Sequence, residues 1–270
     1  IVDSAPHPAS ACSSHAYAIA HPHVGRGAPR LLRLTRIAFL MAEARWGKVW
    51  NQHGIFQPNK KDKAFNRDDV ASYLHSLVLD EGMAQALVAN DARQACGIFQ
   101  DGIWLPRGAS LNLFEATQDA LAPHPKLTCC WNTPVARLEK VNAGWQLIDP
   151  QDKPIMTAGK VIIAAALETK KLAASIDVRL PLRPVRGQLS IFSIDENSSW
   201  AARLPRTAIS GDGYCLPTKK LPNGNYQWIV GSSFDEGESD LQDWDASDDF
   251  NREQARGLLN YEHGDLRQLQ

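Results

Sequence analysis

The tripeptide Arg186-Gly187-Gln188 is the stretch whose residue types are best suited to chemistry. It follows two prolines, which favour extended backbone, and precedes a short apolar run at residues 189–192 that predicts a strand. The arginine offers a fork of donors for a carboxylate or phosphate, and the glycine lets another backbone or a flat ligand approach closely. The alternative interpretation is a strand entry with a solvated arginine.

Composition sets wide bounds on the class of protein. The chain has 270 residues, a net charge of −1, 44% apolar and 22% charged residues, which is typical of a soluble globular protein. A charge near zero gives no global attraction to nucleic acid or to anionic membranes, and no apolar run is long enough to span a bilayer. We therefore expect no membrane partner.

Five cysteines, an odd number, show no CxxC spacing, and His21-Pro22-His23 has no third ligand at helical spacing. The sequence therefore predicts no metal site. Unpaired cysteines fit a reducing, cytoplasmic setting.

Residues 1–3 read as the end of a buried strand closed by an acid, Asp3. In a dinucleotide-binding unit an acid at this place accepts the ribose hydroxyls, although a strand-end Asp is also a common turn residue. The glycine fingerprint that precedes such an acid by about 20 residues is absent, and no GxGxxG occurs elsewhere. The sequence therefore reads as a fragment, and we expect it to bind a dinucleotide weakly or not at all.

Residues 30–46 predict an amphipathic helix. Four apolar residues are expected to form its buried face: Leu31, Leu34, Ala38 and Met41. Two basic clusters are either solvated or contact phosphate: Arg30, Arg33 and Arg36 on this helix, and Lys60, Lys61 and Lys63 on a later turn.

Further elements follow from caps, turns and periodicity. Asn66 predicts a helix cap, residues 83–91 a helical piece, and Asp101-Gly102 the turn of a hairpin over residues 97–106. A helix is expected at residues 112–122, a strand at 127–131, a meander at 134–148, two antiparallel strands at 209–217 and 226–235, an acidic solvated loop at 235–249, and a helix from 250. Residues 160–166 predict a buried strand that ends in alanines and leaves room for a ligand.

The order of these features resembles the D-amino-acid-oxidase-like flavin oxidoreductases. Within them it is most similar to the FAD-dependent carboxyl-terminal half of the bifunctional tRNA 5-methylaminomethyl-2-thiouridine biosynthesis proteins. The motifs that carry the resemblance are His21-Pro22, Arg33 to Arg36, Leu105 to Gly108, Pro181-Leu182, Val185 to Gln188, Gly211 to Tyr214 with Pro217, and Gly231 to Asp235.

The resemblance implies a mixed α/β fold, in which a doubly wound FAD-binding domain is interleaved with a mostly antiparallel substrate domain. It assigns residues 1–46 and 97–178 to an incomplete FAD-binding domain, residues 47–96 and 179–270 to the substrate domain, and implies that a closing carboxyl-terminal segment is missing. The implied catalytic residues are Arg186, Gln188 and Tyr214, and the implied FAD-binding residues are Asp3, Ser13, Ser14, His15, Val135, Ala164, Ala165 and Gly187.

The implied activity is FAD-dependent oxidation of the carboxymethylaminomethyl group on the wobble uridine of tRNA, which cleaves a C–N bond and leaves an aminomethyl group. The implied partners are tRNA and a methyltransferase domain fused upstream. Two alternatives stay open: an oxidase of small amines or amino acids such as glycine or sarcosine, and a truncated remnant that binds no cofactor.

Overall fold

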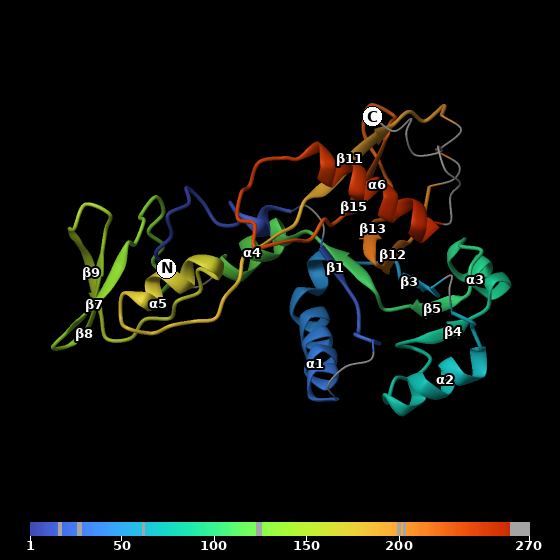
Figure 1. Cartoon of the computed structure of the whole chain (residues 1–270), viewed down its shortest axis with the longest axis horizontal. Coiled ribbons are helices and arrows are strands. Elements are labelled where there is room, and N and C mark those ends of the chain that lie inside the picture. Colours follow the sequence, from blue (N-terminus) through green and yellow to red (C-terminus); the bar gives the residue numbers. More distant parts are fainter. Residues whose placement is uncertain are drawn as a thin grey trace. The chain divides into compact units, whose positions relative to one another are not determined.

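The computed structural model describes residues 1–15, 18–25, 29–60, 63–122, 126–198, 201 and 204–259. The chain divides into two compact units, each built from separate stretches of sequence (Figure 1). The first unit comprises Ile1–Ala16, Leu113–Arg186 and Glu236–Asp240, and the second comprises Tyr17–Asn112, Gly187–Asp235 and Leu241–Gln270. The assignment of cofactor and substrate roles to particular segments stays a prediction.

The first unit is built around a three-stranded antiparallel meander, β7-β8-β9 (Figure 1). Its elements are η1 (Cys12–Ser14), α4 (Leu113–Leu121), β7 (Arg137–Val141), β8 (Gly144–Ile148), β9 (Pro154–Ala158), η3 (Ala166–Glu168), α5 (Thr169–Ala174) and β10 (Val185–Arg186). The predicted meander and the helix at residues 112–122 are confirmed, with β9 as an additional strand.

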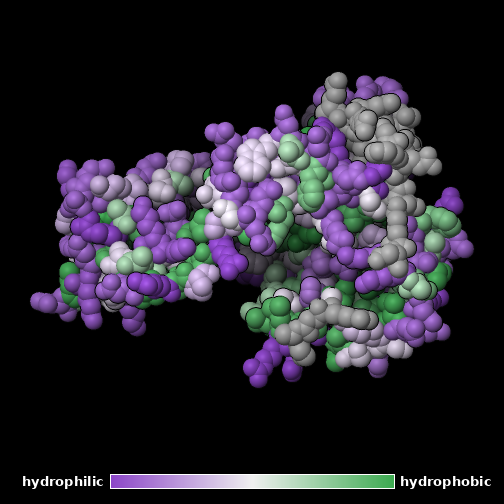
Figure 2. Space-filling model, in the orientation of Figure 1, coloured by the Kyte–Doolittle hydropathy of each residue, from purple (hydrophilic) through white to green (hydrophobic). Residues whose placement is uncertain are grey.

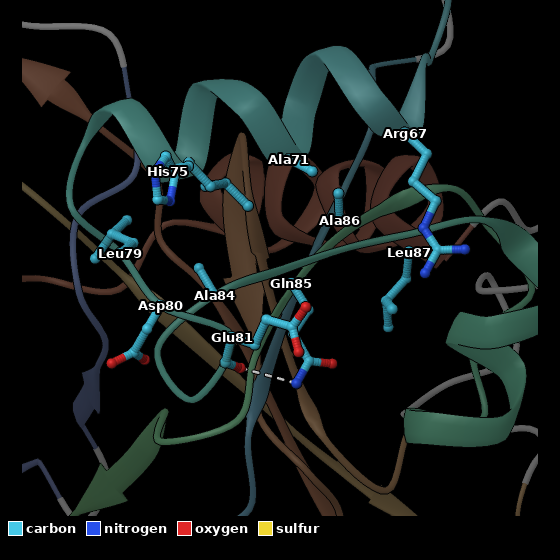
Figure 3. A pocket seen from close by; sticks show the side chains of 11 residues that line it. Arg67, Ala71, His75, Leu79, Asp80, Glu81, Ala84, Gln85, Ala86 and Leu87 are labelled. Atoms are coloured by element: carbon cyan, nitrogen blue, oxygen red, sulfur yellow. Dashed lines mark hydrogen bonds between the residues drawn. The ribbon is translucent and has the colours of Figure 1, made fainter.

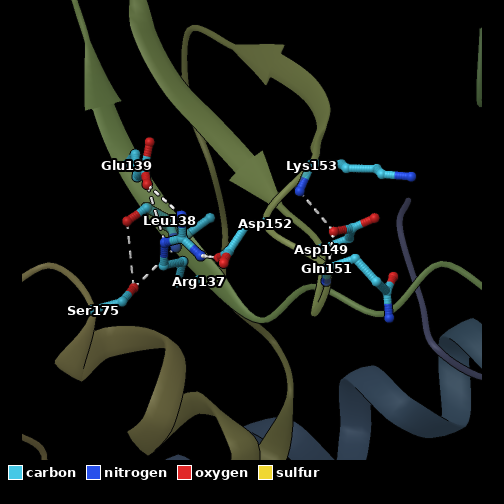
Figure 4. A network of polar contacts seen from close by, with 8 residues as sticks. All are labelled: Arg137, Leu138, Glu139, Asp149, Gln151, Asp152, Lys153 and Ser175. Carbon is cyan, nitrogen blue, oxygen red and sulfur yellow. Dashed lines mark hydrogen bonds and ion pairs between the residues drawn. The ribbon is translucent and has the colours of Figure 1, made fainter.

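Polar contacts hold this meander and the adjacent helix α5 together (Figure 4). The Arg137 guanidinium pairs with Glu139 and Asp152. The Ser175 hydroxyl, just after α5, accepts from the Leu138 N–H at 2.9 Å. Asp149 Oδ1 accepts two N–H groups of the β8–β9 turn at 2.8 Å each. These contacts fix the end of β7 that follows Val135.

The buried strand predicted at residues 160–166 is wrong. Residues 160–165 form neither a strand nor a helix, and the short helix η3 begins at Ala166. Ile162 is 92% exposed. A continuous apolar strand is stable when strands pair with it and helices cover it; among the described residues none pairs with this stretch. The strand predicted at 127–131 is also reduced, to an isolated parallel bridge between Val2 and Cys130.

The second unit is dominated by an eight-stranded sheet in the order β11-β15-β13-β12-β3-β5-β4, with β14 also paired to β15. A separate sheet has the order β1-β6-β2. The elements are β1 (Ala18–Ala20), α1 (Pro29–Trp46), η2 (Gly47–Val49), β2 (Trp50–Gln52), β3 (Ile55–Pro58), α2 (Arg67–Ser76), β4 (Gln85–Leu87), α3 (Ala89–Cys96), β5 (Gly102–Leu105), β6 (Ala109–Leu111), β11 (Leu189–Ile194), β12 (Ala208–Gly211), β13 (Gly213–Cys215), β14 (Lys219–Lys220), β15 (Tyr226–Gly231) and α6 (Asp245–Leu259). The short β16 (Asp235–Glu236) lies where the chain changes unit. Among the described strands of this unit, β3 and β12 pair in parallel and the others pair antiparallel, so the mixed, mostly antiparallel class is confirmed for this unit.

The large sheet buries residues on both faces. Trp228 and Val230 of β15 pack with Cys215 against α6, whereas Ile229, between them, packs in a second core with Leu216 and Ile55. This alternation follows from the two-residue period of a strand. Burial raises the pKa of the Cys215 thiol to about 12.

Helix α1 confirms the predicted helix but not its predicted buried face. The residues that α1 buries are Leu32 and Phe39, and the Phe39 ring lies 5.5 Å from that of Trp50. Leu31 and Met41, expected in the core, are 54% and 67% exposed. Hydrophobic surface is visible where α1 lies (Figure 2). Apolar residues occur on most sides of this helix, so periodicity alone could not select the packed one.

The segment before β6 also differs from the prediction. Residues 83–91 form β4 and the start of α3, and β5 pairs with β3 and β4 rather than forming a local hairpin. Asp101 is not a hairpin turn residue: its Oδ1 accepts the Ala89 N–H at 2.8 Å and so caps α3. The predicted cap at Asn66 is confirmed, because its side chain accepts the N–H groups of Asp68 and Asp69.

Gln188 fastens α6 to the edge strand β11. Its side-chain amide donates to the Trp244 carbonyl at 3.1 Å and to Asp248 Oδ1 at 2.9 Å, and its carbonyl Oε1 accepts the Trp244 N–H at 2.9 Å. Asn251, fully buried, donates to the Gln188 backbone carbonyl at 2.9 Å. Acidic residues in the first turn suit the positive end of the helix, which explains why α6 begins at Asp245 inside the predicted acidic loop.

This contact gives a stability prediction. Gln188→Glu removes two donors and sets a second carboxylate against Asp248, so we expect the free energy of unfolding to fall by about 2–3 kcal/mol. Asp248→Asn alone keeps the acceptor and should have a small effect. In the double variant the new asparagine amide donates to the new glutamate, so urea denaturation should show recovery of at least half the loss. Unchanged stability of Gln188→Glu would contradict this role.

Candidate active site

Two of the predicted catalytic residues belong to the large sheet of the second unit: Gln188 directly precedes β11, Tyr214 lies on β13, and β15 lies between these two strands. Gly231 of β15 is the register partner of Tyr214 on β13 and of Leu189 on β11. Gln188 directly precedes Leu189, so Gln188 and Tyr214 lie at the same end of the three strands. Their side chains lie on opposite faces of the sheet, because Gln188 contacts the start of α6 whereas Tyr214 packs with Leu216 and Ile229.

Glycines allow the close approach of backbone at this end of the sheet. A Cβ on Gly231 would come within 2.5 Å of the Leu189 side chain. A Cβ on Gly187 would lie 3.3 Å from the Ser233 carbonyl oxygen, yet Gly187 itself is exposed. Gly187 thus admits another backbone segment on one side; its contact with a cofactor stays a prediction.

Tyr214 is a half-buried phenol packed against the core that contains Leu216 and Ile229. Burial raises the pKa of its hydroxyl, so the neutral form persists across physiological pH. A neutral phenol donates one hydrogen bond and suits an acceptor such as a carboxylate.

Arg186 is 6% exposed and ends the first unit. Arg186 has an interaction partner within the protein, and a buried guanidinium needs compensation because an uncompensated buried charge is costly. The structure therefore assigns Arg186 and the other two predicted catalytic residues to different units. A role in binding carboxylate stays a prediction.

The predicted FAD-binding residues nearest the amino terminus belong to the first unit. Asp3 is exposed, follows the parallel bridge of Val2, and accepts the Ala5 N–H through Oδ1 at 2.8 Å. Its other carboxylate oxygen fits an acceptor for ribose hydroxyls. Ser13, Ser14 and His15 lie exposed in and directly after η1.

The remaining predicted FAD-binding residues of this unit lie near the meander and η3. The Ala136 N–H donates to the Ile148 carbonyl at 2.8 Å, whereas the backbone groups of Val135 form no hydrogen bond within the described residues. Such open donors and acceptors suit the edge of an adenine. Ala164 is exposed and Ala165 half-buried in the irregular stretch before η3. The donor set of the first unit therefore fits the adenosine part of FAD.

The predicted basic clusters lie in the second unit. Arg30 and Arg33 of α1 are exposed, and Lys60 pairs with Asp212 at 2.8 Å. Lys61 lies outside the described residues. A role for these clusters in binding phosphate stays a prediction.

The second unit also contains a cavity of about 540 Å³ beneath α2, beside the edge strand β4 (Figure 3). Arg67 lies at one end of the cavity lining, and the carboxylates of Asp80 and Glu81 lie at a distance from Arg67 (Figure 3). Because cationic and anionic side chains both line this cavity, its charge does not indicate a class of ligand. Within the described ranges, no three His, Cys, Asp or Glu side chains gather closely enough to hold a metal ion, and no helix combines the length and apolar character needed to cross a membrane.

Comparison with known families identifies relatives of the chain. The model of the DAO family, described as FAD dependent oxidoreductase, matches residues 1–268. The bifunctional protein MnmC of tRNA 5-methylaminomethyl-2-thiouridine biosynthesis from Ralstonia nicotianae is 30% identical over 253 residues, 89% of this chain and 37% of the relative. That of Burkholderia pseudomallei is 28% identical over 263 residues, 93% of this chain and 38% of the relative. The chain thus spans less than two fifths of the length of these relatives.

Solved structures share the fold at low identity. Glycine oxidase from Geobacillus kaustophilus has a TM-score of 0.69 and 16% identity, over 100% of this chain and 72% of its own. FAD-bound L-alpha-glycerophosphate oxidase from Mycoplasma pneumoniae has a TM-score of 0.73 and 12% identity, over 96% and 71%. These likenesses confirm the predicted D-amino-acid-oxidase-like fold. Because the family match covers nearly the whole chain, the protein belongs to the DAO family of FAD-dependent oxidoreductases and uses FAD as its cofactor.

Proposed function

We propose that the protein oxidises the carboxymethylaminomethyl group on the wobble uridine of tRNA and leaves an aminomethyl group. The match to MnmC proteins over 89–93% of this chain is the observation that carries the proposal. The same proposal includes tRNA as the substrate, a fused methyltransferase domain in the whole polypeptide, and the cytoplasm as its location.

The proposed reaction is a two-electron oxidation followed by hydrolysis. The carbon between the amine and the carboxylate loses a hydride and the nitrogen loses a proton, which gives an imine. Water adds to the imine, the C–N bond breaks, and the products are the aminomethyluridine and glyoxylate. FAD, when bound, supplies the acceptor for the two electrons.

The chain's own residues bind and orient the two partners. Asp3, Ser13, Ser14, His15 and the backbone of Val135 are proposed to hold the adenosine and pyrophosphate part of FAD, with Ala164, Ala165 and Gly187 beside it. Arg186 is the proposed partner of the substrate carboxylate, and Tyr214 is the proposed hydrogen-bond donor to the substrate. Gln188 keeps β11 and α6 in place, through the contacts described above, at the end of the sheet where Tyr214 lies.

The reaction itself can be tested with the full polypeptide loaded with FAD. We expect tRNA that carries carboxymethylaminomethyluridine to yield the aminomethyl nucleoside, detected by mass spectrometry, with one glyoxylate released per flavin reduced. Free glycine and sarcosine serve as comparison substrates. If they are oxidised and the tRNA is not, the proposal is wrong and the protein is an oxidase of small amines.

Tyr214→Phe tests the donor to the substrate carboxylate. A lost hydrogen bond to a charged group is worth about 1.5–3 kcal/mol, so KM for the modified tRNA should rise about tenfold or more while flavin content stays constant. Because burial raises the pKa of Tyr214, the ratio of variant to wild-type kcat/KM should not change between pH 6 and pH 9. Equal KM values would exclude this role.

Arg186→Lys tests the carboxylate partner. Lysine lacks the paired donors of the guanidinium, so KM should rise by about tenfold and flavin absorbance should change less. The matched control is Arg183→Lys at a nearby exposed position. Both variants behaving alike would make Arg186 a structural residue of the first unit.

A further inference from the structure

A second cavity of about 560 Å³ lies entirely within the second unit. Leu216 and Ile229 line it, and both belong to the core against which Tyr214 packs. Tyr214 and Leu216 are two residues apart, and the Leu216 N–H continues the ladder by donating to the Ile229 carbonyl at 2.9 Å. The cavity therefore opens on the same face of the sheet as Tyr214.

The charged residues that line this cavity are all cationic: Arg206, Lys219 and Lys220. Lys220 forms an exposed pair with Glu196 at 2.6 Å, whereas Arg206 is exposed and forms no ion pair in the part of the chain that the structure describes. The cavity beneath α2 differs, because Asp80 and Glu81 line it as well. The cationic lining selects an anionic ligand.

His53 adds a neutral acceptor to the same lining. Its Nδ1 is 2.7 Å from the Gly54 carbonyl oxygen and donates to it as Nδ1–H, which leaves Nε2 as an acceptor. Burial lowers the pKa of His53, so this acceptor persists at neutral pH. Nε2 is buried and has no hydrogen-bond partner among the described residues. An N–H or O–H donor of a ligand would satisfy it.

The position of His53 is fixed by its neighbours. The Thr207 hydroxyl, buried next to Arg206, reaches both the His53 and Gly54 carbonyl oxygens, at 3.1 and 2.9 Å. Thr207, which directly follows Arg206, thus binds the connection between β2 and β3 in which His53 lies. The backbone segments that hold His53 and Arg206 are thus joined through the Thr207 hydroxyl.

We propose that this cavity binds one nucleotide of an RNA substrate, with a ring N–H of the base donating to His53 and the phosphate paired with Arg206 and Lys219. A uracil ring carries such an N–H donor at N3. The volume lies within the range of about 300–1,000 Å³ of small-ligand sites. This inference rests on the proposed function, since it names the part of the chain that receives the RNA.

The test is equilibrium binding of uridine monophosphate to the full polypeptide loaded with FAD, with uridine and inorganic phosphate as separate probes. We expect uridine monophosphate to bind more tightly than either. Arg206→Glu should weaken it at least tenfold, and His53→Ala should weaken it while leaving phosphate binding unchanged. The charge-matched control is Lys140→Glu, an exposed residue of the first unit, which should bind like wild type.

Three results would overturn the inference: no binding of uridine monophosphate by wild type, equal binding by wild type and Arg206→Glu, or loss of FAD from Arg206→Glu, which would assign the cations to the cofactor. The salt dependence of tRNA binding provides a second measurement, because each lost phosphate contact lowers the log–log slope by about 0.7–0.9. The two proposals can fail separately. If uridine monophosphate binding depends on Arg206 but the enzyme leaves the modified tRNA unchanged, the proposed reaction is wrong and the proposed nucleotide site is supported.

Discussion

Burying polar groups between β11 and α6 is the constraint on which the second unit depends. A buried donor or acceptor left without a partner costs about 1–3 kcal/mol. The Gln188 side chain donates to Asp248, and the Asn251 amide donates to the Gln188 backbone carbonyl, across two elements distant in sequence. The Asn251 Oδ1 has no partner among the described residues. The contacts of these three residues hold the edge strand β11 against α6, and β11 pairs with β15. Strand β15 pairs in turn with β13, where Tyr214 lies opposite Gly231.

Local chemistry made part of this fold predictable. Asn66 carries its capping role in its own side chain, and the turn after Pro222 closes through the Leu221 N–H and the Asn225 carbonyl at 2.7 Å. Features that depend on contacts between residues distant in sequence were not predictable in the same way. The Asp101 carboxylate serves a helix twelve residues earlier, and α1 has apolar residues on several sides, so only the tertiary neighbours decide which become buried.

The candidate site shows the same division between local and long-range information. The motif around Gln188 and Tyr214 was visible as sequence, and the family resemblance supplied FAD. The cavity next to Tyr214 was not visible, because His53, Arg206 and Lys219 are separated by 153 and 13 positions and are brought together by strand order. A short basic run after Pro217 was the sequence signal that could have pointed to it.

Cys215 lies on the opposite face of β13 from Tyr214, inside the core that α6 covers. Only a thiolate reacts readily with alkylating reagents, and a thiol with a pKa near 12 is almost never ionised at neutral pH. Cys12, in contrast, is exposed. The chain thus contains one thiol that a reagent can reach, Cys12, and one that is covered by α6 and un-ionised, Cys215. The rate at which an alkylating reagent labels Cys215 therefore reports how often α6 separates from the sheet. The labelling rate of the exposed Cys12 in the same molecule provides the reference rate.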